Sequence, residues 1–359
     1  VNLARASGLS TDAHRILDTS PDERFGSTVL VFDRNGDSTA DLFIGAPYAA
    51  GTVSGNCTGI NCGKVYYKGG RDYAFASATD TTSDTSTLTD TLSGSSDKGL
   101  FGSSMVIGAT DIYFNDGTTE HLYVGAPGQE QENIKGYVDY YGVVSGTNLV
   151  DQDQTVAGTL TENSTFEIAN NLFGYSLSVV SSDLDTEGKC PCLLIGAPGS
   201  GYNIGKVRIF GEGLETYIAG SNSTDFLGTS LYTDYINISD LAETVFIGSK
   251  NIGSRNDNLG KITVLRSQNI VSGATSENLI ATTTTTDPAL AYSPVGVVTG
   301  ENLARSISIV QYDSSGNKAL ILGAPGEHDT SSSYLYNRPG IVDEQKGSVQ
   351  IISATKLGF

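Results

Sequence analysis

The chain has few of the residues on which several common functions depend. It contains no Trp, one Met, three His and four Cys in 359 residues. No apolar stretch approaches the roughly 18 residues that a membrane-spanning helix requires. The histidines, His14, His121 and His328, stand apart in the sequence, and no GxSxG, HExxH or P-loop motif occurs. We therefore expect neither catalysis nor membrane insertion, and we expect each histidine to lie at the surface or in a loop.

Basic residues are also scarce. There are 21 Lys and Arg against 40 Asp and Glu, which gives a net charge of −19. A surface of this sign repels nucleic acid and anionic lipid. The acidic residues are spread along the chain, so they do not form an acidic tail. Two explanations remain open: simple solubility, or adaptation to a calcium-rich environment.

The cysteines and the first residue favour a location outside the cell. The chain begins with Val1, so we expect a signal peptide to have been removed. Cys57/Cys62 and Cys190/Cys192 form two close pairs, which favour local disulfides over a zinc site. A bridge within Cys-Pro-Cys would be strained, so the pairing of the second pair is open. Four sequons permit N-glycosylation; they begin at Asn56, Asn163, Asn222 and Asn237.

Three short motifs recur along the chain. An FG motif opens each unit as RFGSTV, LFGSSM, LFGYSL, FLGTSL and, in worn form, LARSIS. A GAP motif follows as LFIGAP, LYVGAP, LLIGAP, the worn VFIGSK, and LILGAP. A GxV motif comes third, as GKVYYKG, GYVDYYG, GKVRIFG, GKITVLR and GSVQIIS. These motifs define five units that start near residues 25, 101, 173, 226 and 304.

Each unit contains short apolar runs rich in β-branched and aromatic residues, which predict strands. We name them A after the FG motif, B through the GAP motif and C through the GxV motif. A fourth strand, D, is expected before the next FG motif, for example at Thr91–Leu92 and Thr159–Leu160. Repeated four-stranded antiparallel units predict an all-β propeller of five blades, forming a single domain over residues 1–359.

The last unit lacks a convincing strand D, whereas the first 24 residues contain a spare apolar pair, Ile16–Leu17. We expect this N-terminal strand to complete the last blade and close the ring, which would remove free sheet edges. The alternative is an open array whose N-terminal strand pairs with a neighbouring molecule.

The order FGxS, DxNGDxxxD, GAP and GxV resembles the FG-GAP repeats of integrin α-subunit propellers. The resemblance covers nearly the whole chain. It implies a β-propeller in which the A–B loops bind calcium and the opposite face recognises ligands. Integrin propellers have seven blades, whereas five units are recognised here, and this sequence shows no sign of the leg domains that follow the propeller in integrins.

The A–B loop of the first unit has the chemistry of a calcium site. Ca²⁺ takes six to eight oxygen ligands from a flexible loop. We expect its ligands to be Asp33, Asn35, Asp37, the carbonyl of Thr39, and Asp41. Gly36 permits the bend. An acidic turn is the alternative, but such a turn would not need Asp41.

The other A–B loops are poorer candidates. Aligned on the GAP motif, Asp41 is matched by His121, Cys192, Thr244 and Ala319. The third unit keeps Asp183, Asp185 and Glu187 in a longer loop, which makes it a weaker second candidate. The loops of the second and fifth units are expected to be ordinary turns.

The sequence therefore predicts a non-catalytic, extracellular or cell-surface module for adhesion or structural interaction, stabilised by Ca²⁺. Its expected partner is a protein or glycan of the cell surface or matrix. One alternative is a self-assembling fibre or coat subunit that uses strand donation. Another is a carbohydrate-binding propeller.

Overall fold

The fold is described from a computed structural model of the chain. It describes residues 14–17, 20, 22–33, 40–51, 57–68, 81–84, 90–109, 120–129, 134–143, 158–161, 170–181, 192–211, 214–220, 224–236, 243–250, 260–266, 302–313, 316–325 and 347–354. None of the described helices is both long and apolar enough to span a membrane.

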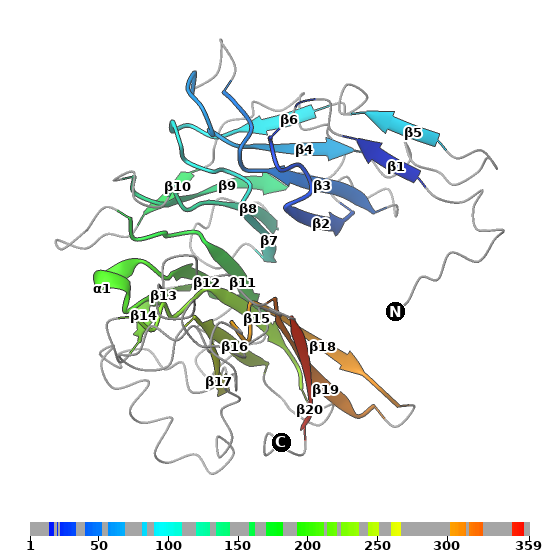
Figure 1. Ribbon diagram of the computed structural model, residues 1–359, viewed down its shortest axis with the longest axis vertical. Helices are drawn as coiled ribbons and strands as arrows, with labels where there is room; N and C mark the ends of the chain where they lie inside the picture. The colour runs from blue at the N-terminus through cyan, green and yellow to red at the C-terminus, as the bar shows by residue number, and fades with distance from the viewer. Residues whose placement is uncertain are drawn as a thin grey trace, which may run out of the picture.

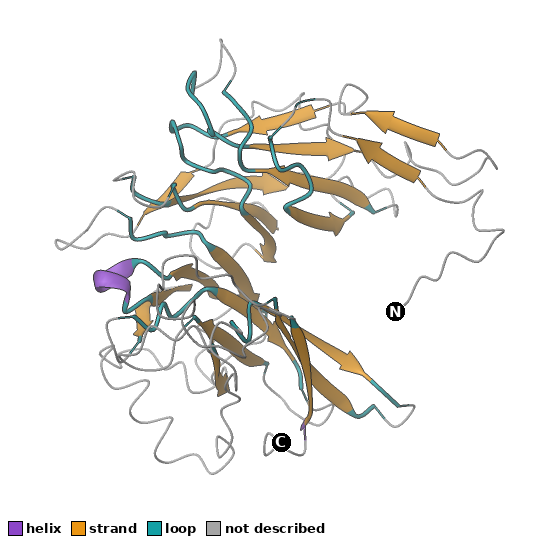
Figure 2. Ribbon diagram, viewed as in Figure 1, coloured by secondary structure: helices purple, strands orange, loops and turns teal. Residues whose placement is uncertain are grey.

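Five antiparallel sheets follow one another in chain order, as predicted (Figures 1 and 2). The first comprises β2 (Thr28–Phe32), β3 (Asp41–Ala46), β4 (Lys64–Lys68) and β6 (Asp90–Ser93). The second comprises β7 (Ser104–Ala109), β8 (Glu120–Ala126), β9 (Tyr137–Val143) and β10 (Gly158–Thr161). The third comprises β11 (Ser176–Val180), β12 (Cys192–Ala197), β13 (Lys206–Gly211) and β14 (Leu214–Ala219).

The last two sheets have three described strands each. They are β15 (Ser230–Asp234), β16 (Thr244–Ser249) and β17 (Lys261–Arg266), then β18 (Ser306–Gln311), β19 (Lys318–Ala324) and β20 (Ser348–Ser353). The short turn α1 (Ser200–Asn203) follows β12. Strands β6 and β10 pair with β4 and β9, which confirms the D strands predicted at Thr91–Leu92 and Thr159–Leu160.

The N-terminal strand does not lie where the sequence predicted. Strand β1 (His14–Leu17) pairs in parallel with β5 (Thr81–Asp84), so Ile16 lies opposite Ser83. The fifth sheet consists of β18, β19 and β20 in the part of the chain that the structure describes. The prediction that this strand completes the last blade is therefore wrong in this structure. The pair Ile16–Leu17 is too short an apolar pattern to determine which sheet edge this strand pairs with.

The core is divided among the spaces between consecutive sheets. Phe43 and Tyr67 of the first sheet pack with Phe101 and Leu122 of the second unit, and similar clusters join each later pair of sheets. The A strands contact one another in order: β2 with β7, β7 with β11, β11 with β15, and β15 with β18. The B strands β3, β8, β12 and β16 lie inside their sheets and are almost wholly buried, which explains their unbroken apolar sequence. Strand β19 of the last sheet is only partly buried.

The FG and GAP motifs form the joint between neighbouring sheets. Within a unit, the backbone N–H of Gly102 donates to the carbonyl of Gly125 at 3.1 Å. Across units, Ser104 Oγ donates to the carbonyl of Gly174 at 2.7 Å. A Cβ on Gly125 would lie 2.1 Å from that same carbonyl oxygen. The GAP motif therefore requires Gly because the backbone of the next unit occupies the place of a side chain.

The joint repeats along the array. The same cross-unit hydroxyl bond runs from Thr28 to Gly102, from Ser176 to Gly228 and from Ser230 to Ala304. The matching glycines of the first, third and fourth GAP motifs also face the next unit's backbone; they are Gly45, Gly196 and Gly248. The spacing of the motifs thus encodes how one sheet is fixed to the next.

Both ends of the array carry half of this joint. A Cβ on Gly26, in the first FG motif, would meet no described atom within 4 Å. A Cβ on Gly323, in the last GAP motif, would meet only atoms of Ser306 in its own unit. The end sheets also expose apolar side chains, with Val29 59% exposed on β2 and Ile351 69% exposed on β20. The two ends are complementary surfaces that no other described unit covers.

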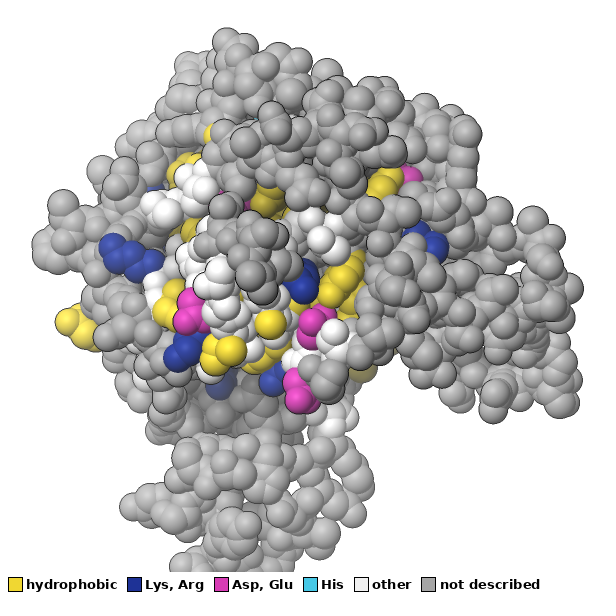
Figure 3. Space-filling view, turned by 90° about the horizontal axis from the view of Figure 1, so that it is seen from above, with side chains coloured by type: hydrophobic (Ala, Val, Ile, Leu, Met, Phe, Trp, Pro, Cys, Tyr) yellow, Lys and Arg dark blue, Asp and Glu magenta, His cyan; other side chains and the backbone are white. Residues whose placement is uncertain are grey.

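Figure 3 views the molecule from the side of its first sheet. The described side chains on this face mix hydrophobic groups with basic and acidic ones, and no patch of one charge dominates them. The described side chains on this face do not form the basic stripe that is typical of nucleic-acid-binding proteins.

Candidate functional site

The predicted calcium loop lies at the end of the β2–β3 hairpin. Phe32 pairs with Asp41, so Asp33 and Asp41 flank the loop at the same end of the sheet. Asp41 is fully buried, whereas Asp33 is exposed. Asn35, Asp37 and Thr39 lie outside the described residues. The hairpin therefore brings together the first and last of the five predicted ligands.

These two residues fit a hard cation. Asp41 is buried beside a loop whose other predicted donors are all oxygens, the ligands that Ca²⁺ prefers. Asp33 and Asp41 would supply carboxylate ligands, and the segment between them would supply the rest of the shell.

The strand register confirms the alignment of Asp41 with the other units. His121, Cys192, Thr244 and Ala319 occupy the same place in their sheets, four residues before the paired glycine of the GAP motif. All four are buried, as Asp41 is, but none of them carries a carboxylate that could bind Ca²⁺. Asp183, Asp185 and Glu187 lie outside the described residues.

His121 corrects the prediction for the histidines, because it is fully buried inside β8. Its ring lies 5.4 Å from that of Tyr140 and 6.0 Å from that of Tyr123. The alignment with Asp41 already placed His121 at the start of a buried strand. Its position in the repeat is therefore a better guide to its burial than its polar side chain. The side chains of His14 and His328 lie outside the described part of the structure.

The fifth A–B loop is held by side-chain hydrogen bonds. Asp313 accepts a bond from the backbone N–H of Asn317 at 2.9 Å and a second from its side-chain amide at 2.5 Å. This arrangement is an ordinary Asp-initiated turn, as the sequence predicted. Nearby, Lys318 pairs with Asp234 at 3.2 Å and so links the last two sheets.

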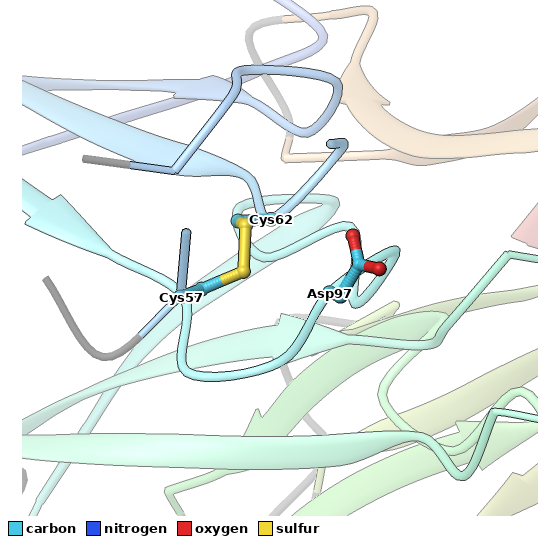
Figure 4. A group of neighbouring side chains, drawn as sticks. All are labelled: Cys57, Cys62 and Asp97. Carbon is cyan, nitrogen blue, oxygen red and sulfur yellow. A yellow bond between two sulfur atoms is a disulfide. The ribbon is translucent and has the colours of Figure 1, made fainter. Parts of the chain in front are cut away.

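Cys57 and Cys62 form a disulfide, as predicted for this pair, with their Cα atoms 6.1 Å apart (Figure 4). Asp97 lies beside the bridge, and the three side chains are the one potential metal-ligand cluster among the described residues. Both sulfurs are used in the bridge, so this cluster is structural. The loop also docks on the next unit, because Ile60 accepts a bond from the N–H of Lys98.

Two other predictions about covalent chemistry fall largely outside the described residues. Cys192 is in a disulfide, and Cys190 lies outside the described residues. The four sequon asparagines, Asn56, Asn163, Asn222 and Asn237, also lie outside them.

Sequence reasoning missed a buried carboxyl group between the first two sheets. Asp139 of β9 is 1% exposed, and its Oδ1 accepts a hydrogen bond from Thr159 at 2.6 Å. Its Oδ2 has no hydrogen-bond partner among the described residues. Burial raises the pKa of Asp139 to about 6, although the Thr159 bond opposes the shift. Burial raises the pKa of Tyr141 on the same strand as well.

Sequence reasoning also missed a pocket at the joint of the third, fourth and fifth units. Its lining includes Tyr175, Ser249, Lys250, Asn302 and Arg305. Ser249, Lys250 and Arg305 belong to the two worn motifs, VFIGSK and LARSIS, and Asn302 directly precedes the second. The departure from the repeat was visible in the sequence, but the convergence of both motifs on one pocket needed the fold.

No protein-family model matches this chain, and no curated protein matches it either. The interpretation of the site therefore depends on its own residues.

Proposed function

We propose that the protein is a non-catalytic, extracellular interaction module built from FG-GAP-type propeller blades and stabilised by Ca²⁺. The observation that carries the proposal is the buried Asp41 across the hairpin from Asp33, within the one loop that has a full set of oxygen donors. The Cys57–Cys62 bridge is in keeping with an oxidising compartment. The expected partner is a protein or glycan of the cell surface or matrix.

The recurring joints support the blade interpretation. The FG and GAP motifs hold neighbouring backbones together at four successive sheet interfaces. Residues used in this way are a scaffold, which leaves recognition to loops and to departures from the repeat.

Calcium should stabilise the fold through the first hairpin. Extracellular calcium modules bind with dissociation constants of roughly 10⁻⁴ to 10⁻³ M. By mass action, 1 mM Ca²⁺ should then add about 0.4 to 1.4 kcal/mol to the free energy of unfolding. Thermal melting with calcium and with a chelator measures this gain, and Asp41→Ala should remove most of it.

The matched control is Asp97→Asn, which alters an exposed carboxylate outside the hairpin and should keep the full gain. The gain is compared within each variant, so any direct cost of replacing buried Asp41 cancels. An unchanged melting temperature of the parent on chelation would rule out the calcium site.

The open half-joints favour a second candidate function, a self-assembling subunit. Gly26 and Gly323 present complementary halves of the joint that fixes every interior sheet. Within one molecule they would close a propeller ring, and between molecules they would join copies head to tail. Unlike strand donation, this association uses side-by-side packing of whole sheets.

Sedimentation of the parent chain over a range of concentrations distinguishes ring closure within one molecule from head-to-tail assembly of several molecules. Self-assembly predicts species larger than a monomer, which Gly323→Ala should dissociate because its new Cβ would clash with an occupying backbone. A monomer at every concentration would contradict self-assembly, and a large loss of stability in monomeric Gly323→Ala would indicate ring closure.

A further inference from the structure

The pocket at the joint of the last three units differs in chemistry from every other joint. Where the other GAP motifs have Ala-Pro, this one has Ser249-Lys250. In the FG motif of the next unit, Asn302 takes the place of Leu100 and Leu172. All of these FG positions share a left-handed backbone, with φ of 50° at Asn302 and 58° at Leu100. The fifth unit therefore has an amide side chain, Asn302, where the second and third units have leucine, and the backbone conformation is the same.

Two of the substituted side chains, Asn302 and Ser249, are buried without a hydrogen-bond partner in the described structure. Asn302 is only 4% exposed, and neither its Nδ2 nor its Oδ1 has a hydrogen-bond partner in the described structure. Ser249 is 1% exposed, and its Oγ likewise lacks a partner there. Leaving a buried polar atom unpaired costs about 1 to 3 kcal/mol. A ligand that supplies both donors and acceptors would satisfy these atoms.

The rim of the pocket is basic and aromatic. Lys250 and Arg305 both line it, and the Arg305 guanidinium lies 5.1 Å from the ring centroid of Tyr175. No acidic residue is among the described residues that line the pocket. Asp225, whose carbonyl accepts the N–H of Lys250, pairs its carboxylate with Lys261 at 4.0 Å. Two cations without a lining acid are unusual in a chain of net charge −19.

We infer that this pocket binds an acidic saccharide residue. The sugar carboxylate lies against Lys250 and Arg305, and sugar hydroxyls pair with the Asn302 amide and Ser249 Oγ. A bare anion does not satisfy Asn302 Oδ1, which needs a donor, whereas a hydroxylated acid does. Tyr175 adds an aromatic side chain at the rim. The pocket lies at the start of the A strands, the opposite end from the calcium hairpin.

The test is a titration of the full chain with sodium glucuronate, with glucose as the matched neutral sugar. Ligand-observed NMR should show saturable binding of glucuronate with a dissociation constant of roughly 1 mM. Glucose should bind at least about tenfold more weakly, because it lacks the charge that Lys250 and Arg305 attract.

Two variants restore residues that other units carry at the same positions. Asn302→Leu matches Leu100, and Arg305→Ser matches Ser103, so both should fold. Each should weaken glucuronate binding at least about tenfold. The matched control is Arg24→Ser, which removes another arginine stacked on a tyrosine, Tyr48 at 4.0 Å, and should leave binding unchanged.

Several results would overturn the inference. They are the absence of saturable glucuronate binding, equal binding of glucose, and full affinity in the Asn302→Leu variant. Tighter binding of a blocked aspartate peptide than of glucuronate would assign the pocket to an acidic protein segment instead. Loss of calcium binding in Asp41→Ala has no bearing on these outcomes, because the two sites lie at opposite ends of the strands.

Discussion

Replacing Gly125 by Ala should cost about 3 kcal/mol or more of the free energy of unfolding, because the array has no room for one methyl group at this joint. The new Cβ would lie 2.1 Å from the carbonyl oxygen of Gly174 and 2.2 Å from Ser104 Oγ. The hydroxyl can turn away, but the carbonyl belongs to the backbone of the next unit. Urea unfolding of the parent and the variant measures the loss.

Gly323→Ala is the matched control, because this glycine has the same place in the last unit. Its Cβ would meet Ser306 Oγ at 2.2 Å, and the nearest backbone atom would be 3.8 Å away. Only a hydroxyl has to turn, so at a concentration where the chain is monomeric the cost should stay below about 1 kcal/mol. Equal losses in the two variants would contradict an open array of joints.

The second large effect concerns pH. The pKa of Asp139 is raised from 3.8 to about 6, so between these values the folded state binds more protons than the unfolded state. Stability that depends on this group is therefore fully present below pH 4 and falls as the pH rises through 6. The shift corresponds to roughly 3 kcal/mol at pH 7.

Asp139→Asn should remove this penalty, since an amide stays neutral and can keep the Thr159 bond. The gain of the variant over the parent in urea unfolding should be about 3 kcal/mol larger at pH 7 than at pH 4. Glu120→Gln, an exposed carboxylate on the neighbouring strand β8, should show no such dependence. If Asp139→Asn gains the same free energy of unfolding at both pH values, the buried carboxyl group does not cause the pH dependence of stability.

The sheets could be predicted from the sequence because the repeated motifs make the contacts that fix each sheet to the next. A GAP glycine must recur wherever a neighbouring backbone comes within contact distance, so its spacing marks each joint. The partner of β1 could not be predicted, because Ile16–Leu17 is a short apolar pair without such a constraint. The pairing with β5 depends on where the chain after β4 returns, and no local pattern records that.

The candidate sites were predicted to different degrees. The proposed calcium hairpin could be recognised in the sequence because its predicted ligands are close together and Asp41 directly begins strand β3. Asp139 was missed because a single carboxylate among tyrosines looks like an exposed strand residue until two sheets cover it. The pocket was missed because Lys250 and Asn302 are distant in the sequence, and only the joint brings the two worn motifs together.

Equilibrium dialysis with radioactive calcium tests the proposed function most directly. The parent chain should bind about one Ca²⁺ through the first hairpin, with a dissociation constant of roughly 10⁻⁴ to 10⁻³ M. Asp41→Ala should lose this ion, while Asp97→Asn keeps it. Binding that is absent from the parent, or that persists unchanged in Asp41→Ala, would contradict a calcium-stabilised module built around this hairpin.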